Sequence, residues 1–341
     1  TGQLLSRLTS DIAEIGELSF RGPNDVIVCC ITMVGTIGIL FWMNVYLGIL
    51  IALLLITKTL HTVYVNKKMK AAVVRGARQP NHEVTILKQI DTLIIGATAL
   101  AYPLAARLGG AALVVESGFS VGAEFSEAMI AERVKNAEHT GLAGEICAEL
   151  EERGILLPDG RIHILAVGGA LAGKYLETGA EILLGTAVTD ISRVQDGFIA
   201  TLFGAENGYE QIAAKRVVDT RTREFMDCRK VFGLMLAGEK DMNVWSDDKS
   251  FVEHGVFDDE YILHLYVDRD STIPDCEKYA DEWLKTNRSR IGNARVAGIT
   301  LVFGYRFAEP VREERDGIIY VPSASYPDVI SAVRGGEELC L

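Results

Sequence analysis

"DTLIIGATALAYPLAARLGGAALVVESG", residues 91–118, has the pattern of a strand, a tight turn, a helix and a second strand. The apolar run that precedes Gly96 is typical of a buried strand, and Gly96 supplies the turn. A helix of small residues then extends to Leu108, and "AALVVE" forms the second strand. Glu116 ends this strand 20 residues after Gly96, the spacing at which an acid reaches the ribose of a dinucleotide.

The turn departs from the usual glycine-rich pattern at two positions. Thr98 replaces the glycine that lets the backbone approach a diphosphate, although its hydroxyl can donate to phosphate. Ala101 replaces the glycine that allows close helix packing, and Pro103 lies inside the predicted helix. The local motif therefore leaves two readings open, a dinucleotide site and an ordinary strand–helix–strand unit.

Charge divides the 341-residue chain into two parts. Residues 1–78 carry eight Lys/Arg and four Asp/Glu, a net charge of +4, whereas the remainder carries 26 and 42, a net charge of −16. An acidic body argues against nucleic acid as a partner. The six cysteines form no C-x-x-C pair and no His/Cys cluster with metal-ligand spacing, so we expect reduced thiols and no metal.

Residues 26–56 contain no charged side chain. Extended to residues 23–65, the run is long enough for two membrane spans of about 20 residues each, with a break near Asn44. Arg7 and Arg21 precede the run, and five basic residues follow it between positions 67 and 78. The positive-inside rule then predicts a helical hairpin with both ends in the cytoplasm.

"TGQLLSRLTSDIAEI" (residues 1–15), this hairpin and "NKKMKAA" (residues 66–72) together resemble the transmembrane domain of an ABC exporter. The resemblance covers residues 1–78 and implies two of the usual six spans, so we expect a fragment or a fusion. An exporter also needs an ATPase, and "GGALAGKY" (residues 168–175) nearly fits a P-loop. Tyr175 stands where a small hydroxyl must meet magnesium, so we expect a packed helix there that binds no ATP phosphate.

Four segments of residues 90–341 resemble the FAD-dependent oxidoreductases of the glutathione-reductase-like superfamily, in particular a bacterial branch whose first turn reads G-A-T. They are the unit above with its tail "ESGFSVGAEFSEA", then "HILAVGGALAGKYLETGAEILLGTAVTDI", "AAKRVVDTR" and "GIIYVPSASYPDVISAVRGGEEL". Aligned on Asp219, Arg221 and Thr222 stand where the family has Thr-Gly. The resemblance implies FAD and the cofactor-binding residues Gly96, Ala97, Thr98, Glu116, Ser117, Val188, Thr220 and Ser325. It also implies a closing helix that starts near Ser325 and directs its N-terminal dipole at the flavin.

Between Thr222 and Pro310 the pattern changes to alternating runs, which predict an antiparallel sheet inserted as a substrate domain. "YILHLYVD" (residues 261–268) and "GITLVFGYRF" (residues 298–307) are predicted strands, and "CEKYADEWLKT" (residues 276–286) is a predicted amphipathic helix. His264 is expected to be a packed strand histidine more than a catalytic one. Arg306 and Arg312 are open to two readings, as ligands of an anionic substrate or as solvated charges.

These patterns predict an α/β fold in which a parallel-sheet, Rossmann-like FAD domain carries an inserted antiparallel-sheet substrate domain and follows an all-α transmembrane hairpin. The expected function is an FAD-dependent oxidoreductase that acts on a small molecule, with no catalytic residue identified. The expected location is the bacterial cytoplasmic membrane, with the FAD domain in the cytoplasm and a dimer possible through the hairpin. The alternative is a fragment of an ABC transporter permease with a passenger domain. The predicted boundaries are a hairpin at 1–78, a linker at 79–89, the FAD domain at 90–221 and 311–341, and the substrate domain at 222–310.

Overall fold

The computed structural model describes residues 86–135, 139–204 and 208–340. The chain divides into two compact units, Thr1–Asn81 and His82–Leu341, and the described residues belong to the second. The predicted hairpin and the exporter-like segment therefore lie outside the described residues. Within the described ranges, no helix combines the length and the apolarity that a membrane span needs.

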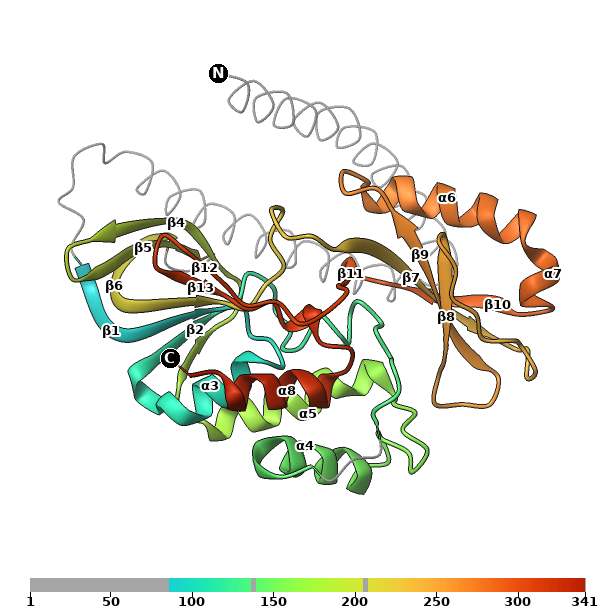
Figure 1. The fold of residues 1–341 in the computed structure, drawn as a ribbon, viewed down its shortest axis with the longest axis horizontal. Helices are drawn as coiled ribbons and strands as arrows, with labels where there is room; N and C mark the ends of the chain where they lie inside the picture. The colour runs from blue at the N-terminus through green and yellow to red at the C-terminus, as the bar shows by residue number, and fades with distance from the viewer. Residues whose placement is uncertain (1–85, 136–138, 205–207, 341) are drawn as a thin grey trace, which may run out of the picture. The chain divides into compact units, whose positions relative to one another are not determined.

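An eight-stranded mixed sheet forms the larger half of the described fold (Figure 1). Its main path runs β12-β13-β6-β1-β2-β3, and β4 and β5 continue from β6 as an antiparallel meander. The first strand pairs in parallel with β2, as the strand–helix–strand pattern predicts, and on its other side it pairs in parallel with β6. The strands are β1 (Ile86–Ile95), β2 (Ala112–Val115), β3 (Glu181–Leu183), β4 (Thr186–Val194), β5 (Gly197–Gly204), β6 (Gly208–Asp219), β12 (Glu313–Arg315) and β13 (Ile318–Tyr320).

Helices cover one face of this sheet, and the meander folds over the other (Figure 1). Alternation along β1 serves both faces, because Ile94 packs toward the helices while Leu93 and Ile95 pack toward the meander. A buried strand with apolar residues on both faces accounts for the unbroken apolar run before Gly96. The helices are α3 (Ala101–Leu108), α4 (Gly141–Glu152), α5 (Ile164–Glu177) and α8 (Val329–Glu338), with a 3₁₀ turn η1 (Gly109–Ala111) after α3.

A five-stranded antiparallel sheet is inserted in the chain between β6 and β12. Its order is β10-β7-β9-β8, with β11 also paired to β7, and Trp283 of α6 packs into the core beneath it. The opposite face presents Ile262 to the core of the larger sheet. The elements are β7 (Arg229–Ala237), β8 (Ser250–His254), β9 (Glu260–Val267), α6 (Ile273–Thr286), α7 (Arg288–Ile291), β10 (Arg295–Ile299) and β11 (Gly304–Arg306).

Two predicted elements differ from the structure. The single strand expected over residues 298–307 is wrong, because β10 and β11 are separated at Thr300, whose hydroxyl donates to the Glu127 carbonyl at 2.6 Å. The closing helix does not start near Ser325, which belongs to the 3₁₀ turn η2 (Ser323–Ser325). Pro327 favours extended backbone at Tyr326, the residue before it. The helix α8 therefore starts at Val329, with Asp328 as its N-cap.

Candidate functional site

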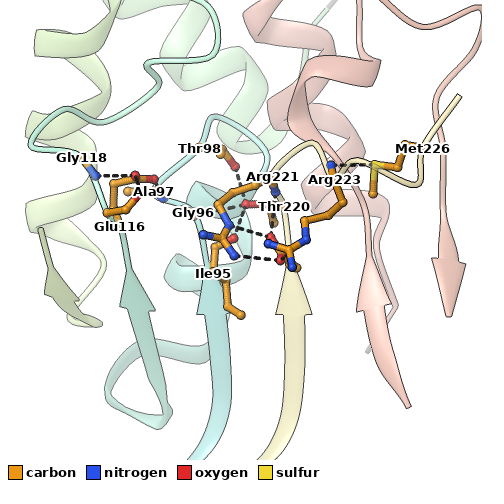
Figure 2. A network of polar contacts seen from close by, with 12 residues as sticks. Ile95, Gly96, Ala97, Thr98, Glu116, Gly118, Thr220, Arg221, Arg223 and Met226 are labelled. Carbon is orange, nitrogen blue, oxygen red and sulfur yellow. Dashed lines mark hydrogen bonds and ion pairs between the residues drawn. The ribbon is translucent and has the colours of Figure 1, made fainter. Parts of the chain in front are cut away.

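The carboxyl ends of five parallel strands, β13, β6, β1, β2 and β3, meet at one edge of the larger sheet. Backbone hydrogen bonds continue past the strand ends, from Gly96 N to Val115 O at 2.8 Å and from Thr220 N to Ile95 O at 2.9 Å. Figure 2 shows Glu116 on one side of Gly96, and Thr220 and Arg221 on the other. Ligands of open parallel sheets bind at this kind of edge, so the polar side chains gathered here form the candidate site.

Gly96 makes the turn after β1 with φ at +100°, a conformation that side chains other than glycine rarely adopt. A Cβ atom at this position would lie 2.7 Å from Thr220 Oγ1 and 2.9 Å from the Cγ atom of Arg221. The position therefore requires glycine for two independent reasons, its backbone conformation and the close approach of the chain that follows β6.

Glu116 follows β2 and directs its carboxylate at the neighbouring turns (Figure 2). Its Oε2 atom accepts from Ala97 N at 3.1 Å, and its Oε1 atom accepts from Gly118 N at 2.7 Å and from the Ser117 hydroxyl at 3.1 Å. These bonds orient the carboxylate at the end of the second strand. The predicted residues Gly96, Ala97, Glu116 and Ser117 are thus brought together.

Thr98, which stands where the usual motif has glycine, forms hydrogen bonds within the protein. Its hydroxyl donates to Thr220 Oγ1 at 2.9 Å and accepts from Ala101 N at 3.2 Å, while Thr220 donates to the Ile95 carbonyl at 3.0 Å. Thr98 is 5% exposed. Because its hydrogen is already shared with Thr220, the hydroxyl ties the turn to β6 and is not a ready donor to phosphate.

Glu124, which the sequence analysis did not single out, approaches the same turn from the loop after β2. Its Oε1 atom accepts from Ala99 N at 2.8 Å and from the Ser323 hydroxyl at 2.7 Å. Leu100 N in turn donates to Ser323 Oγ at 3.3 Å. Glu124 is half-buried at the wall of a cavity, and the burial of its carboxyl group raises its pKa to about 7. In the sequence Glu124 is one acidic residue in the segment after β2, and no neighbouring residue indicates the direction of its side chain.

Four backbone N–H groups around the start of α3 are consequently bonded within the protein. Ala97 N is bonded to Glu116, Ala99 N to Glu124, Leu100 N to Ser323 and Ala101 N to Thr98. These groups are the donors that a dinucleotide fold normally offers to phosphate. The edge fits a dinucleotide in its glycine turn and its carboxylate at the end of β2, but its phosphate donors are already bonded within the chain.

Arg221 lies across the turn from the β6 side. Its guanidinium meets Asp219 in a two-pronged pair, from Nε to Oδ1 and from Nη2 to Oδ2, both at 3.0 Å. The Asp219 side chain is 3% exposed, whereas the Arg221 side chain is 25% exposed. Arg223 approaches the same carboxylate only to 3.8 Å and is 44% exposed. Arg221 is therefore a positioned cation that solvent still reaches.

Val188 and Ser325, two further predicted cofactor residues, line two different cavities. Val188, on β4, lines a cavity of about 320 Å³ together with Asp219 and Arg221. Ser325 lines a second cavity of about 290 Å³ together with Glu124, and its hydroxyl donates to Pro322 O at 2.7 Å.

The second cavity brings the two sheets of the described unit together. Phe251 and Arg306 come from the inserted sheet, and Glu124 and Tyr326 come from the loops of the larger one. The guanidinium of Arg306 lies 4.4 Å from the centre of the Phe251 ring and 3.5 Å from a carboxylate oxygen of Glu132. Burial raises the pKa of Glu132, with Arg306 acting in the opposite direction. The cavity thus combines an aromatic wall, a cation and the carboxyl groups of Glu124, Glu132 and Glu309.

His264 lies beneath this wall with none of its side chain exposed. It stacks on Phe251 with ring centres 4.3 Å apart, and Nε2 is 2.9 Å from Glu253 Oε2. Nδ1 has no hydrogen-bond partner among the described residues. The geometry is that of a packed strand histidine.

The P-loop-like segment lies wholly within α5, and the buried Tyr175 hydroxyl donates to Thr98 O at 2.7 Å.

No protein-family model matches the chain. A stretch of 72 residues is 35% identical to the uncharacterized ABC transporter ATP-binding protein YwjA of Bacillus subtilis strain 168. That stretch is 21% of this chain and 12% of the relative, so the chain spans about an eighth of the relative's length. The match lies in the N-terminal part, outside the described residues.

Solved structures resemble the described part at low sequence identity. Glycine oxidase from Geobacillus kaustophilus is 12% identical with a TM-score of 0.49, over 73% of this chain and 92% of that one. L-proline dehydrogenase from P. horikoshii is 13% identical with a TM-score of 0.49 over the same shares. Glycerol-3-phosphate dehydrogenase from Bacillus halodurans, complexed with FAD, is 15% identical with a TM-score of 0.47, over 74% of this chain and 64% of that one.

Proposed function

We propose that the chain is an FAD-dependent oxidoreductase whose cofactor binds at the carboxyl edge of the larger sheet. The observation that carries the proposal is the pairing of two features on adjacent parallel strands. Gly96 makes a turn that admits no side chain after β1, and the Glu116 carboxylate is held beside that turn at the end of β2. In parallel sheets this pairing is typical of a dinucleotide site.

In this proposal Glu116 accepts hydrogen bonds from the ribose hydroxyls of the adenosine half of the cofactor. Bound flavin would supply the chemistry, as a carrier of a hydride equivalent and of electrons. The protein residues contribute position and electrostatics.

The cavity that joins the two sheets is the proposed place for a small-molecule substrate. Phe251 offers an apolar wall, and Arg306, paired with Glu132, lies over its ring, which suits a substrate with an apolar body and a polar group. Glu124 lines the same cavity with a pKa of about 7, so its carboxyl group can take up or release a proton near neutral pH. We therefore propose Glu124 as the residue that exchanges a proton with the substrate.

The test is flavin binding by the full chain, purified in mild detergent. Wild-type protein is expected to carry FAD or to take it up, with the visible absorbance of bound flavin. Glu116→Ala removes a charge-assisted acceptor and should weaken binding about ten- to a hundredfold. Glu210→Ala, at the opposite end of the sheet on β6, is the matched control and should leave the affinity unchanged. A folded, colourless protein that FAD cannot reconstitute would refute the proposal.

We also propose that residues 23–65 form the helical hairpin described above, with the flavoprotein part in the cytoplasm. The support is the charge-free run of residues 26–56 and the basic residues that flank it. Cysteines placed at Arg21 and Lys70 should both be labelled from the cytoplasmic side. Labelling from opposite sides would contradict the hairpin. The match to an ABC transporter protein favours a transporter fragment as the rival function, for which transport by the full chain is the test.

A further inference from the structure

We propose that Arg221 binds the diphosphate of the cofactor, in place of the backbone N–H groups that precede α3. This inference rests on the FAD site proposed above and says which group holds its phosphates. Positions 221 and 222 differ from the Thr-Gly of the resembling family, and the proposal gives the arginine at position 221 a binding role.

The first step is that the usual donors are already bonded. Ala97 N and Ala99 N donate to the carboxylates of Glu116 and Glu124, at 3.1 and 2.8 Å. A phosphate that displaced Glu124 would leave a half-buried carboxyl group without its two donors, which is costly. A phosphate that did not displace it would have to compete for the N–H groups of Ala97 and Ala99 with the carboxylates already bonded to them. Either way, the start of α3 is a poor phosphate site in this chain.

The second step is that Arg221 is built into the edge. The Cγ atom of its side chain lies 2.9 Å from where a Cβ of Gly96 would be, so the stem rests on the glycine turn. Asp219 fixes the guanidinium through Nε and Nη2, which leaves the outer N–H groups of the fork to face a ligand. Arginine in this two-sided arrangement binds a carboxylate on one edge and suits a phosphate on the other.

The third step is charge. Glu116, Glu124 and Asp219 make this edge acidic, and a diphosphate would add further negative charge to it. Arg221 is the cation held against the turn, with its Nε atom 3.0 Å from Asp219 and its side chain 25% exposed. Arg223 is held less closely, because its Nε atom is 3.8 Å from Asp219 and its side chain is 44% exposed. Arg223 therefore supplies a matched control, as a cation on the same loop that shares the same carboxylate but not the contact with Gly96.

The experiment titrates the full chain in mild detergent with ADP, with FAD and with adenosine, by calorimetry. Arg221→Ala should weaken ADP and FAD about ten- to a hundredfold and leave adenosine unchanged, because adenosine carries no phosphate. Arg221→Lys should recover part of the loss, since it keeps the charge without the fork. Arg223→Ala should bind all three ligands as the wild type does.

The outcomes separate this inference from the proposed function. FAD affinity that is unchanged in Arg221→Ala overturns the inference and leaves the flavoprotein assignment intact. ADP binding that depends on Arg221 in a protein that takes no flavin supports the inference and removes the assignment. Equal losses for ADP and adenosine, or no binding of any ligand by the wild type, overturn the inference. If Arg221→Ala does not fold, Asp219→Asn combined with Arg221→Met removes both charges, and wild-type ADP affinity in that double variant overturns it.

Discussion

The starts of α3 and α6 both involve a carboxylate, and the two arrangements serve different purposes. At α6, Thr272 and Asp275 cap each other, with the Asp275 carboxylate accepting from Thr272 N at 3.2 Å and the Thr272 hydroxyl accepting from Asp275 N at 3.4 Å. Before α3, the partners are Glu124 and Ser323, which are 25 and 223 residues away from the N–H groups they satisfy. The cap of α6 is wholly local, whereas α3 adds to its local bond from Ala101 N to Thr98 two partners that are present only when the sheet edge has assembled.

The pKa values of the two carboxyl groups move in opposite directions. The hydrogen bond from the Thr272 side chain holds the pKa of the exposed Asp275 below its usual value. Burial raises the pKa of Glu124 to about 7 despite its two donors. The charge at α6 therefore favours the folded state, while the charge at α3 opposes it. A carboxyl group kept at this cost beside a cavity is the usual mark of a functional position.

The sharpest way to break the α3 arrangement is Gly96→Val. The new side chain would meet Thr220 and Arg221 at a φ of +100°, so we expect loss of flavin binding and destabilisation by about 4 kcal/mol or more. Gly154→Val, a glycine at φ +66° with open space around its Cβ position, is the matched control for backbone strain alone. Equal losses of flavin in both variants would show that the crowding at Gly96 has no special role. Flavin absorbance and urea unfolding measure the two effects.

Much of the fold could be predicted because its signals are local. The apolar run before Gly96 and the run that ends at Glu116 do form adjacent parallel strands. The alternation of residues 261–268 does form a strand of the inserted antiparallel sheet. The break at Thr300 could not be predicted, since it depends on a hydrogen bond to Glu127, which lies 173 residues earlier in the chain.

The site was predictable only in part, for the same reason. Gly96 and Glu116 follow from spacing within one strand–helix–strand unit. Glu124 was missed because its role depends on contacts with Ala99 and Ser323, which no pattern of neighbouring residues encodes. In the sequence Arg221 differs from the family pattern, which gives it no role. Its side chain lies beside Gly96 because β1 and β6 pair in parallel, and the sequence around either residue does not indicate that proximity.

Glu124→Gln tests whether the raised pKa of this carboxyl group makes the stability of the protein depend on pH. Glutamine can still accept from Ala99 N and Ser323, but it does not ionise. Below the ordinary pKa of 4.5, Glu124 is protonated in both the folded and the unfolded state, so the charge makes no difference there. Between pH 4.5 and 7 the unfolded state releases its proton first, and the wild type loses stability. The variant should therefore match the wild type at low pH and exceed it by up to about 3 kcal/mol at pH 8.

Urea midpoints for Glu124→Gln and wild type across this pH range measure the difference. Glu127→Gln, on the same loop, reports the effect of removing one charge without removing the contact with α3. A Glu124→Gln variant that gains nothing at pH 8 would show that the carboxylate is not opposed by the fold, and the contrast with Asp275 would disappear.

The smallest effect is expected at α6, and it tests whether a local cap is replaceable. Thr272→Ala removes the hydroxyl that accepts from Asp275 N, a change that costs about 0.5–2 kcal/mol at helix N-caps. Thr272→Ser keeps the acceptor and should be nearly neutral. Because the hydroxyl also holds the pKa of Asp275 down, the cap contributes above the ordinary pKa of 3.8 and its contribution fades as pH falls through the lowered pKa. The loss in Thr272→Ala should thus shrink toward low pH, opposite to the trend at Glu124, and flavin binding should not change. A loss of flavin in Thr272→Ala would mean that the two helix starts are coupled through the inserted sheet.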